Sequence, residues 1–375
     1  MPTPPSDAII VGAGIVGVAC AKELADAGLS VTVIESGPAV GCGATAAGMG
    51  HIAVMDDSDE QFALTSYSQR LWRELAAELP RGAEYLACGS LWVAADEEEF
   101  AEVRRKCSFY SARGIPVEIL DSKQLSEAEP NLRSGMAGGL LMSNDGVCYP
   151  PCATGYLAET VSKRRGRIIT GKRIAQVSTR CVRDEAGTTF EAELVILATG
   201  AVARQLVPGL EVVPRKGHLL ITDRYPGFIR HQLIELGYLK SAHSSSADSV
   251  AFNAQPRQTG QILIGSSRQF GVEDSAVEAS MLSRMLARAV EYMPRLAELS
   301  AIRSWTGFRA ATPDKLPFIG RHAELDGVYL ATGHEGLGIS TSLATAKLLA
   351  DEILGRASVI PRSPYAPTRS FAVHG

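Results

Sequence analysis

The residues best suited to chemistry near the start of the chain are three glycines and one acid. Gly12, Gly14 and Gly17 form a Gly-x-Gly-x-x-Gly motif, and Glu35 follows about 20 residues later. In such a motif Gly12 permits a tight turn, Gly14 lets the backbone approach a pyrophosphate, and Gly17 lets a helix pack closely. Glu35 can accept both ribose hydroxyls of an adenosine and would repel a 2′-phosphate. The pattern therefore predicts a site for the ADP part of NAD or FAD.

Two strands and one helix must position this motif. Residues 8–11 form a short apolar run, typical of a strand buried on both faces, and residues 30–34 form a second. Between them, residues 18–25 have a helical period. The N-terminus of that helix would offer free N–H groups and the positive end of its dipole to phosphates. The alternative is a glycine-rich turn in an unrelated α/β protein.

Later segments indicate a second part of the same site. Residues 41–51, Gly-Cys-Gly-Ala-Thr-Ala-Ala-Gly-Met-Gly-His, are small enough for a flat ring system to lie against the backbone. Residues 192–201 and 327–333 contain apolar runs that read as buried strands leading to Thr-Gly. The second run leads into a glycine-rich junction and a helix predicted over residues 342–354, whose N-terminus could stabilise negative charge on a bound ring.

Composition excludes several classes of protein. A net charge of −4 and a pI near 6.0 provide no basic patch suited to a nucleic acid. The seven cysteines are scattered, so we expect neither a metal site nor a disulfide framework. No apolar run approaches the roughly 18 residues that a membrane span needs, and no basic segment precedes the first strand. We expect a cytoplasmic protein in which any contact with the inner membrane would be peripheral.

The remaining segments predict a second lobe. Residues 89–94 read as a strand and residues 96–113 as a charged helix. Residues 217–222 and 261–266 read as strands of a larger, mostly antiparallel sheet, followed by a helix at 277–292. We expect the proline-rich tail after Ile360 to run over the surface.

Together these landmarks resemble the D-amino-acid-oxidase family of flavoproteins, which includes glycine oxidase and sarcosine oxidase. The resemblance covers nearly the whole chain, through the glycine motif with Glu35, residues 44–49, 197–200, 305–309 with 312–314, and Gly333-His334. The stretch 333–339 looks more like the catalytic subunits of heteromeric dye-linked dehydrogenases, namely D-hydroxyproline dehydrogenase, opine oxidase and hydrogen cyanide synthase. Residues 46–51 with 55–58 look closest to D-hydroxyproline dehydrogenases.

The resemblance implies an α/β (α+β) fold with two domains. A Rossmann-type FAD-binding domain would comprise residues 1–84, 150–215 and 305–375, and a substrate domain residues 85–149 and 216–304. The implied cofactor contacts are Gly12, Gly14, Ile15, Val16, Gly17, Glu35, Ser36, Ala44, Thr45, Ala46, Gly48, Met49, Gly50, His51, Ile174, Thr199, Gly200, Gly307, Arg309, Gly333, His334, Glu335, Gly336, Leu337, Gly338, Ile339 and Ser340. Monomeric sarcosine oxidases attach flavin through a cysteine shortly after the Trp-x-Gly-x-Arg motif; here residues 310–313 are Ala-Ala-Thr-Pro, so we expect non-covalent FAD.

Arg309 is the leading substrate residue. It matches the arginine of the family's Trp-x-Gly-x-Arg motif, where a bidentate guanidinium–carboxylate pair would orient an amino acid. His51 is the second candidate, as a contact of the ring or of the substrate amine; a packed histidine is the alternative. Lys216 and His218 are weaker candidates, for which solvated or packed roles are favoured. Glycine oxidases have an arginine near the position of Gly336, which argues against glycine oxidase activity here.

The implied reaction is dehydrogenation of an amino or imino acid to the imine. The lead substrate, on resemblance alone, is cis-4-hydroxy-D-proline or another D-amino acid, and the alternative is glycine, sarcosine or an N-alkyl amino acid. Either oxygen or partner subunits carrying further redox centres could take the electrons. Two other readings stay open: a flavin-carrying subunit of an electron-transfer complex without its own chemistry, and a plain NAD-dependent dehydrogenase.

Overall fold

The glycine motif lies between two parallel strands. In a computed structural model, which describes residues 6–237 and 248–371, β1 (Ser6–Val11) pairs in parallel with β2 (Val31–Ile34), and α1 (Ile15–Asp26) connects them. Gly12 has a φ of +103°, and a Cβ there would lie 2.5 Å from the carbonyl oxygen of Ala198. The turn after β1 therefore requires glycine.

The first sheet brings the carboxyl ends of its parallel strands together. β1 pairs in parallel with β2 and with β11 (Thr189–Leu197), and β11 pairs in parallel with β18 (Val328–Thr332). Parallel strands have their carboxyl ends at one edge of the sheet, which is where ligands of open α/β sheets bind. The remaining strands of the sheet are β8 (Arg167–Ile169), β9 (Ile174–Ser178), β10 (Cys181–Asp184) and β17 (Phe318–Arg321).

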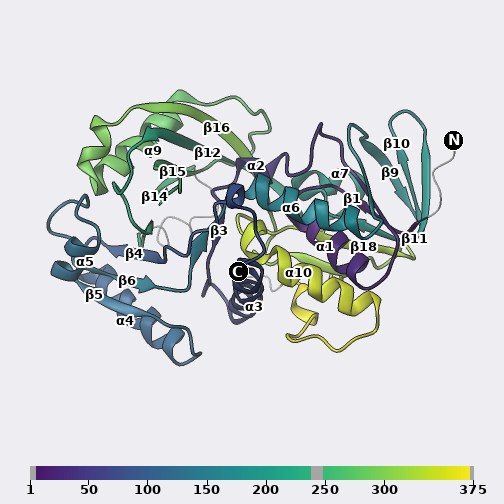
Figure 1. Cartoon of the computed structure of the whole chain (residues 1–375), viewed down its shortest axis with the longest axis horizontal. Helices are drawn as coiled ribbons and strands as arrows, with labels where there is room; N and C mark the ends of the chain where they lie inside the picture. Colours follow the sequence, from purple (N-terminus) through teal and green to yellow (C-terminus); the bar gives the residue numbers. More distant parts are fainter. Residues whose placement is uncertain (1–5, 238–247, 372–375) are drawn as a thin grey trace.

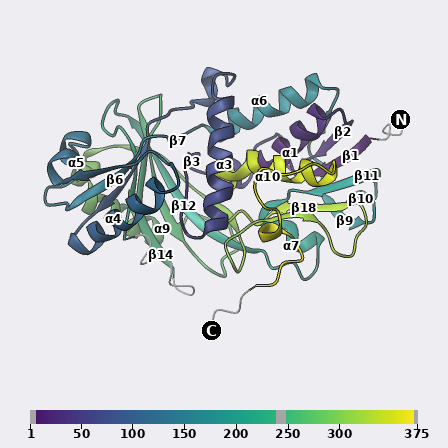
Figure 2. The same cartoon turned by 90° about the horizontal axis from the view of Figure 1, so that it is seen from below.

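Helices cover this sheet and form the largest apolar core. α1 packs against α6 (Pro150–Lys163) and α10 (Gly338–Ile353), and α10 packs against α3 (Asp59–Leu75). Both views show α3 between the two large sheets (Figures 1 and 2). α10 begins at Gly338, four residues before the predicted start at Ser342. Its N-terminus consequently reaches further towards the sheet edge than the sequence indicated.

The second sheet is mostly antiparallel, as predicted. Its eight strands lie in the order β16-β12-β15-β14-β13-β4-β6-β5, and only the β13–β4 pair is parallel among the described pairings. The bounds are β4 (Ser90–Ala94), β5 (Glu118–Asp121), β6 (Gly138–Met142), β12 (Val213–Arg224), β13 (Gln232–Glu235), β14 (Ser249–Pro256), β15 (Gln261–Arg268) and β16 (Ala301–Ala311). α9 (Ala279–Tyr292) packs on β14 and β15, and α4 (Glu97–Ser111) packs on β4 and β6. The mixed α/β fold expected from the sequence is thus confirmed.

Short elements join the two sheets and end the chain. They are α2 (Ala44–Ala47), β3 (His51–Ile52), α5 (Ser122–Ala128), β7 (Gly146–Val147), α7 (Ala203–Leu206) and the 3-10 helices η1 (Arg81–Ala83), η2 (Gly200–Val202), η3 (Pro294–Glu298) and η4 (Ser363–Tyr365). The tail expected to run over the surface instead buries Tyr365, whose hydroxyl donates to the carbonyl of Glu60 at 2.6 Å.

The division into two domains stays a prediction. Its boundaries at 215/216 and 304/305 fall inside β12 and β16, which pair with each other in the second sheet. Residues 1–5, 238–247 and 372–375 of the predicted domains lie outside the described residues. Within the described ranges, no helix combines the length and the apolar character that crossing a membrane requires.

Candidate active site

A cavity of about 880 Å³ runs from the turn after β1 to the second sheet. Its volume is in the upper range of ligand pockets. Most of the predicted site residues line it: Gly12, Gly14, Ile15, Val16, Glu35, Ser36, Ala44, Thr45, Gly48, Met49, Gly50, His51, Ile174, Thr199, Gly200, Gly307, Arg309, His334, Glu335, Gly336, Leu337, Gly338 and Ile339. The structure therefore brings together residues from both ends of the chain.

Four predicted residues are not on the cavity wall. Gly17 packs against the turn, because a Cβ there would lie 2.0 Å from the carbonyl oxygen of Gly12. Ser340 donates to the carbonyl of His51 at 2.8 Å. Ala46 is exposed, and a Cβ at Gly333 would lie 2.6 Å from a methyl carbon of Thr312. Direct contact of these four with a cofactor stays a prediction.

At one end of the cavity, Glu35 is fixed across the glycine turn. One carboxylate oxygen accepts the N–H of Ala13 at 2.7 Å, and the other accepts the N–H of Gly37 at 2.7 Å. The side chain of Thr45 accepts the N–H of Ile15 at 3.0 Å, in the first turn of α1. No acidic residue lies in that first turn, so the helix N-terminus can hold a phosphate without repulsion.

Two observations test whether this end fits a dinucleotide. Gly48 and Ile339, which both line the cavity, lie so close together that a Cβ at Gly48 would be 2.9 Å from the side chain of Ile339. Thr199 lines the cavity, and its hydroxyl oxygen is buried without a hydrogen-bond partner in the described part of the chain. A narrow glycine-lined cradle with a buried hydroxyl needing a partner fits a bound dinucleotide.

In the junction between β18 and α10, the side chain of His334 does not titrate near neutral pH. His334 is buried, its Nε2 lies 3.0 Å from the hydroxyl of Thr345, and burial lowers its pKa to about 3. Glu335 has a φ of +51°, and its N–H donates to the carbonyl of Ala310 at 2.8 Å. One carboxylate oxygen of Glu335 accepts from Arg215 at 2.6 Å, and the other is buried without a hydrogen-bond partner within residues 6–237 and 248–371. His334 is therefore neutral at pH 7, whereas Glu335 belongs to a charged cluster.

Arg309 lies between two glycines at the second-sheet end of the cavity. A Cβ at Gly217 would lie 2.4 Å from Nη1 of Arg309, and one at Gly336 would lie 3.3 Å from its Nε. Nη1 donates to the carbonyl of Ser267 at 2.9 Å. Burial lowers the pKa of Arg309, against the opposing charge of Glu335, but a guanidinium stays protonated at neutral pH. Gly217 and Gly336, which have no side chain, thus leave the space that this guanidinium occupies.

His51 is a neutral wall residue. Burial, together with the charge of Arg309, lowers its pKa to about 4. Its Nε2 is buried and has no hydrogen-bond partner among the residues that the structure describes. A neutral imidazole with one unsatisfied nitrogen can donate to or accept from a ligand, depending on its tautomer.

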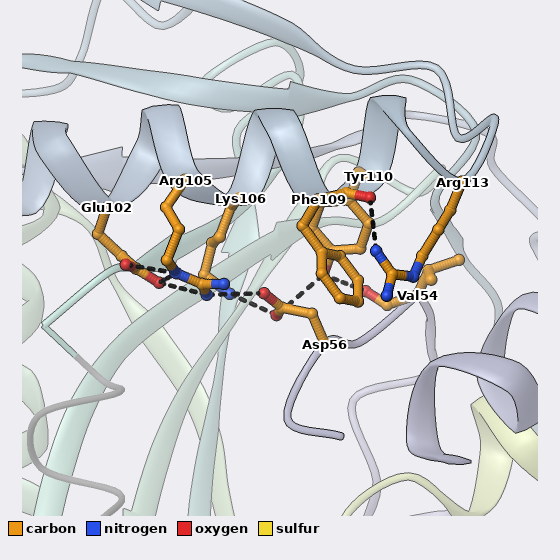
Figure 3. A network of polar contacts seen from close by, with 8 residues as sticks. All are labelled: Val54, Asp56, Glu102, Arg105, Lys106, Phe109, Tyr110 and Arg113. Carbon is orange, nitrogen blue, oxygen red and sulfur yellow. Dashed lines mark hydrogen bonds and ion pairs between the residues drawn. The ribbon is translucent and has the colours of Figure 1, made fainter. Parts of the chain in front are cut away.

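The segment between His51 and α3 is held by a buried charge network. Lys106 of α4 forms an ion pair with Asp56, and both side chains are almost fully buried. Asp56 also accepts from the hydroxyl of Tyr110 at 3.0 Å and from Arg105 at 3.1 Å (Figure 3). The neighbours of Asp56 in sequence, Met55 and Asp57, line the cavity. The network thus fixes one cavity wall to α4, which packs on the second sheet.

Sequence reasoning missed several polar wall residues on the second sheet. Arg215, Gln232, Asn253 and Arg268 all line the cavity. Each sits in or beside an apolar run, and a polar residue inside a buried strand was the available signal. Lys216 and His218, the weaker candidates, do not line it. Lys216 pairs with Asp274 at 3.1 Å, and Nδ1 of His218 lies 2.9 Å from the hydroxyl of Ser267.

No group of three or more metal-ligating side chains gathers anywhere in the described part of the chain. All seven cysteines lie in that part and are free thiols. The cavity therefore has to be understood from its glycines, guanidinium groups and neutral polar side chains.

Known proteins resemble this chain along almost its whole length. Glycine oxidase of Geobacillus kaustophilus (strain HTA426) is 29% identical, with 98% of each chain covered. Hydrogen cyanide synthase subunit HcnC of Pseudomonas protegens is 27% identical, with 97% of this chain and 96% of the relative covered.

Solved structures give the same result. The crystal structure of glycine oxidase from Geobacillus kaustophilus matches with a TM-score of 0.89 and 27% identity, covering 99% of this chain and 100% of that one. The structure of L-proline dehydrogenase from P. horikoshii matches with a TM-score of 0.87 and 25% identity, covering 98% of both chains. The sequence profile of the DAO family, described as FAD dependent oxidoreductase, matches residues 7–352. Since that match spans most of the chain, the protein belongs to the DAO family and is an FAD-dependent oxidoreductase.

Proposed function

We propose that the chain oxidises an amino or imino acid at its CH–N bond, with Arg309 binding the substrate carboxylate. The supporting observation is the position of Arg309, a guanidinium held between Gly217 and Gly336 on the wall of the cavity. FAD, when bound, supplies the electron acceptor for the oxidation. Arg309 can use two parallel N–H donors to fix both the position and the orientation of a carboxylate.

The protein also provides a largely neutral environment for the amine of the substrate. His51 and His334 both have pKa values far below neutrality, so neither carries a charge that would repel the substrate nitrogen. Nε2 of His51 is available to accept or donate a hydrogen bond there. The residues orient the substrate and exclude water, and the oxidation needs no strong acid or base from the protein.

For the substrate itself, the lead candidate is cis-4-hydroxy-D-proline, and other D-amino acids belong to the same proposal. Buried side-chain oxygen or nitrogen atoms of Asn253 and Gln232, both on the cavity wall, have no hydrogen-bond partner among the described residues. Those atoms suit a substrate with an additional polar group. Glycine, sarcosine or an N-alkyl amino acid is the alternative, supported by the match to glycine oxidase of Geobacillus kaustophilus in sequence and in structure.

The final electron acceptor is a separate part of the proposal. HcnC, one relative, is named as a subunit. We infer from this that partner subunits carrying further redox centres are the alternative to oxygen. A cytoplasmic location and non-covalent FAD belong to the same proposal; residues 310–313, which follow the Trp-x-Gly-x-Arg motif, contain no cysteine.

A dye-reduction screen over D- and L-amino acids, run with and without oxygen, tests the function. The panel contains cis-4-hydroxy-D-proline, D-proline, L-proline, glycine and sarcosine. We expect at least one to reduce the dye, and Arg309→Met to lower kcat/KM by on the order of 10²-fold or more with FAD retained. Arg303→Met, an exposed arginine on the same strand, is the control. Dye reduction by none of them, or undiminished turnover by Arg309→Met, would refute the proposal.

A further inference from the structure

The wall that the second sheet gives to the cavity changes in character along the order of its strands. Its three arginines come from β12, β15 and β16, which are neighbours at one edge of the sheet. The next three strands, β14, β13 and β4, contribute Asn253, Gln232 and Trp92 to the same wall. A substrate whose carboxylate is bound by Arg309 can therefore extend from a cationic part of the wall over an uncharged one.

The uncharged part of the wall offers no countercharge of its own. Within the described spans of β4, β13 and β14, the only charged residue is Glu235. Glu235 accepts from Arg288 of α9 at 2.7 Å and does not line the cavity. A charged group of a ligand would consequently leave water for this part of the wall without an opposite charge on these strands, which is unfavourable.

Gln232 is the most deeply buried polar residue in this part of the wall. Its side chain has no exposed surface, yet neither its amide oxygen nor its amide nitrogen has a hydrogen-bond partner among the residues that the structure describes. Buried amides are nearly always hydrogen-bonded, because an unpaired one loses its solvation without compensation. Since Gln232 lines the cavity, a ligand there can supply the missing partner.

Two further polar groups surround the same patch. The side-chain oxygen of Asn253 and Nε1 of Trp92 are buried, again without a hydrogen-bond partner in the described ranges. Ile234, two residues after Gln232 and on the same face of β13, pairs in register with Asn253 on one side and with Trp92 on the other. The patch thus combines an acceptor, a donor and an amide that is both, and none of the three is charged.

The distance from Arg309 indicates which part of a substrate reaches this patch. Nη1 of Arg309 donates to the carbonyl of Ser267 on β15 at 2.9 Å, so the guanidinium lies beside that strand. β13 is two strands further along the sheet, and a spacing of about 4.8 Å per strand places it roughly 10 Å away. A group that contacts Gln232 is therefore separated from the α-carboxylate by several bonds, as the end of a side chain is.

We propose that Gln232 is a specificity-determining residue whose carboxamide binds an uncharged polar group of the substrate, a hydroxyl or a carboxamide. The inference rests on the function proposed above, in which Arg309 binds the α-carboxylate. A hydroxyl or a carboxamide can both donate to and accept from the amide of Gln232. An apolar group leaves that amide unpaired, and a carboxylate lacks a countercharge there.

Binding of compounds that cannot be oxidised as amines tests this assignment apart from turnover. Glutaramate, 5-methylhexanoate and glutarate share one carboxylate and one chain length, and they end in a carboxamide, an isopropyl group and a carboxylate. 5-Hydroxypentanoate and hexanoate make the corresponding comparison for a hydroxyl. Titration calorimetry with the FAD-loaded protein gives the Kd values. We expect at least one of the two uncharged polar compounds to bind about 10-fold more tightly than its apolar counterpart, and glutarate to bind less tightly than glutaramate.

Variants then show which side chain is responsible. Gln232→Leu should abolish the preference for the polar compounds while leaving the Kd values of 5-methylhexanoate and hexanoate nearly unchanged, and Arg309→Met should weaken all five. Gln258→Leu, at an exposed position between β14 and β15, is the matched control and should change none of them. If Gln232→Leu does not retain FAD, Gln232→Met replaces it and must remove the same preference.

Three results would overturn the assignment. They are equal binding of the polar and apolar compounds, which would mean that water is the partner of the Gln232 amide, tighter binding of glutarate than of glutaramate, and a preference that survives Gln232→Leu. Failure of the proposed oxidation would show differently, as absence of dye reduction by every amino acid, since the binding comparison involves no turnover.

Discussion

The buried pair between Asp56 and Lys106 predicts a large and non-additive loss of stability when either charge is removed. The side chains are 2% and 1% exposed, and the pair joins α4 to the segment that forms one cavity wall (Figure 3). Removing one member of a buried ion pair typically costs about 3–5 kcal/mol, because the other charge is left uncompensated.

The two single substitutions should differ in size. In Lys106→Met, Asp56 keeps the hydroxyl of Tyr110 at 3.0 Å and the half-exposed Arg105 at 3.1 Å, so we expect a loss near 3 kcal/mol. In Asp56→Asn, Lys106 loses its countercharge and keeps a neutral amide oxygen and a weak attraction to the Trp92 ring, whose centroid lies 5.0 Å away. We expect that loss to approach 5 kcal/mol.

The double variant Asp56→Asn/Lys106→Met separates the pair from its surroundings. With both charges gone, no buried charge is left unpaired, so its loss should fall at least 2 kcal/mol below the sum of the two single losses. Urea denaturation at one fixed FAD concentration, followed by circular dichroism, measures the apparent free energy of unfolding. Single losses below about 1 kcal/mol, or additive ones, would refute the reasoning.

Three further predictions concern the turn, a buried acid and the wall histidine. Gly12→Ala should weaken FAD binding by on the order of 10²-fold, because a Cβ at this position would lie 2.5 Å from a backbone oxygen. Titration of the apoprotein with FAD measures the effect. The control is Gly28→Ala, where φ is also positive but a Cβ would meet open space, and it should bind FAD normally. Burial raises the pKa of Asp145 to about 7, so between pH 4 and 7 this carboxyl group binds a proton more fully in the folded protein than in the unfolded chain. The free energy of unfolding should therefore fall by up to roughly 4 kcal/mol as the pH rises from 4 to 7. Asp145→Asn should flatten that dependence in denaturation midpoints, and an unchanged slope would count against it. Since the pKa of His51 is about 4, the pH profile of turnover between pH 6 and 9 should have the same shape in wild type and His51→Ala.

The first part of the site could be predicted because its constraints are local. Gly12, Gly14 and Glu35 lie within one β-α-β unit, and the turn and helix that join its strands require these residue types at fixed spacing. Family resemblance then supplied Arg309, whose surroundings the sequence alone does not describe.

The parts that were missed depend on contacts between distant segments. Arg268 becomes a site residue because β15 places it beside Arg309, 41 positions later in the chain. Asp56 and Lys106 are 50 residues apart, and in sequence they read as ordinary surface charges. α10 begins four residues before its predicted start, and the side chain of His334, outside the helix, contacts Thr345 within it. Residue types and hydrophobic periodicity in the sequence do not reveal these contacts between distant residues.

The most direct test of the central claim is anaerobic mixing of the FAD-loaded protein with an amino acid that reduces the dye. The loss of the oxidised flavin's visible absorption is followed in wild type, Arg309→Met and Arg303→Met. The proposed clamp predicts fast, saturable reduction in wild type and in Arg303→Met. In Arg309→Met, reduction should be slower by roughly 10²-fold at the same substrate concentration, with FAD still bound. Equal reduction rates in all three proteins would contradict the role of Arg309, and no reduction by any amino acid would contradict the proposed function.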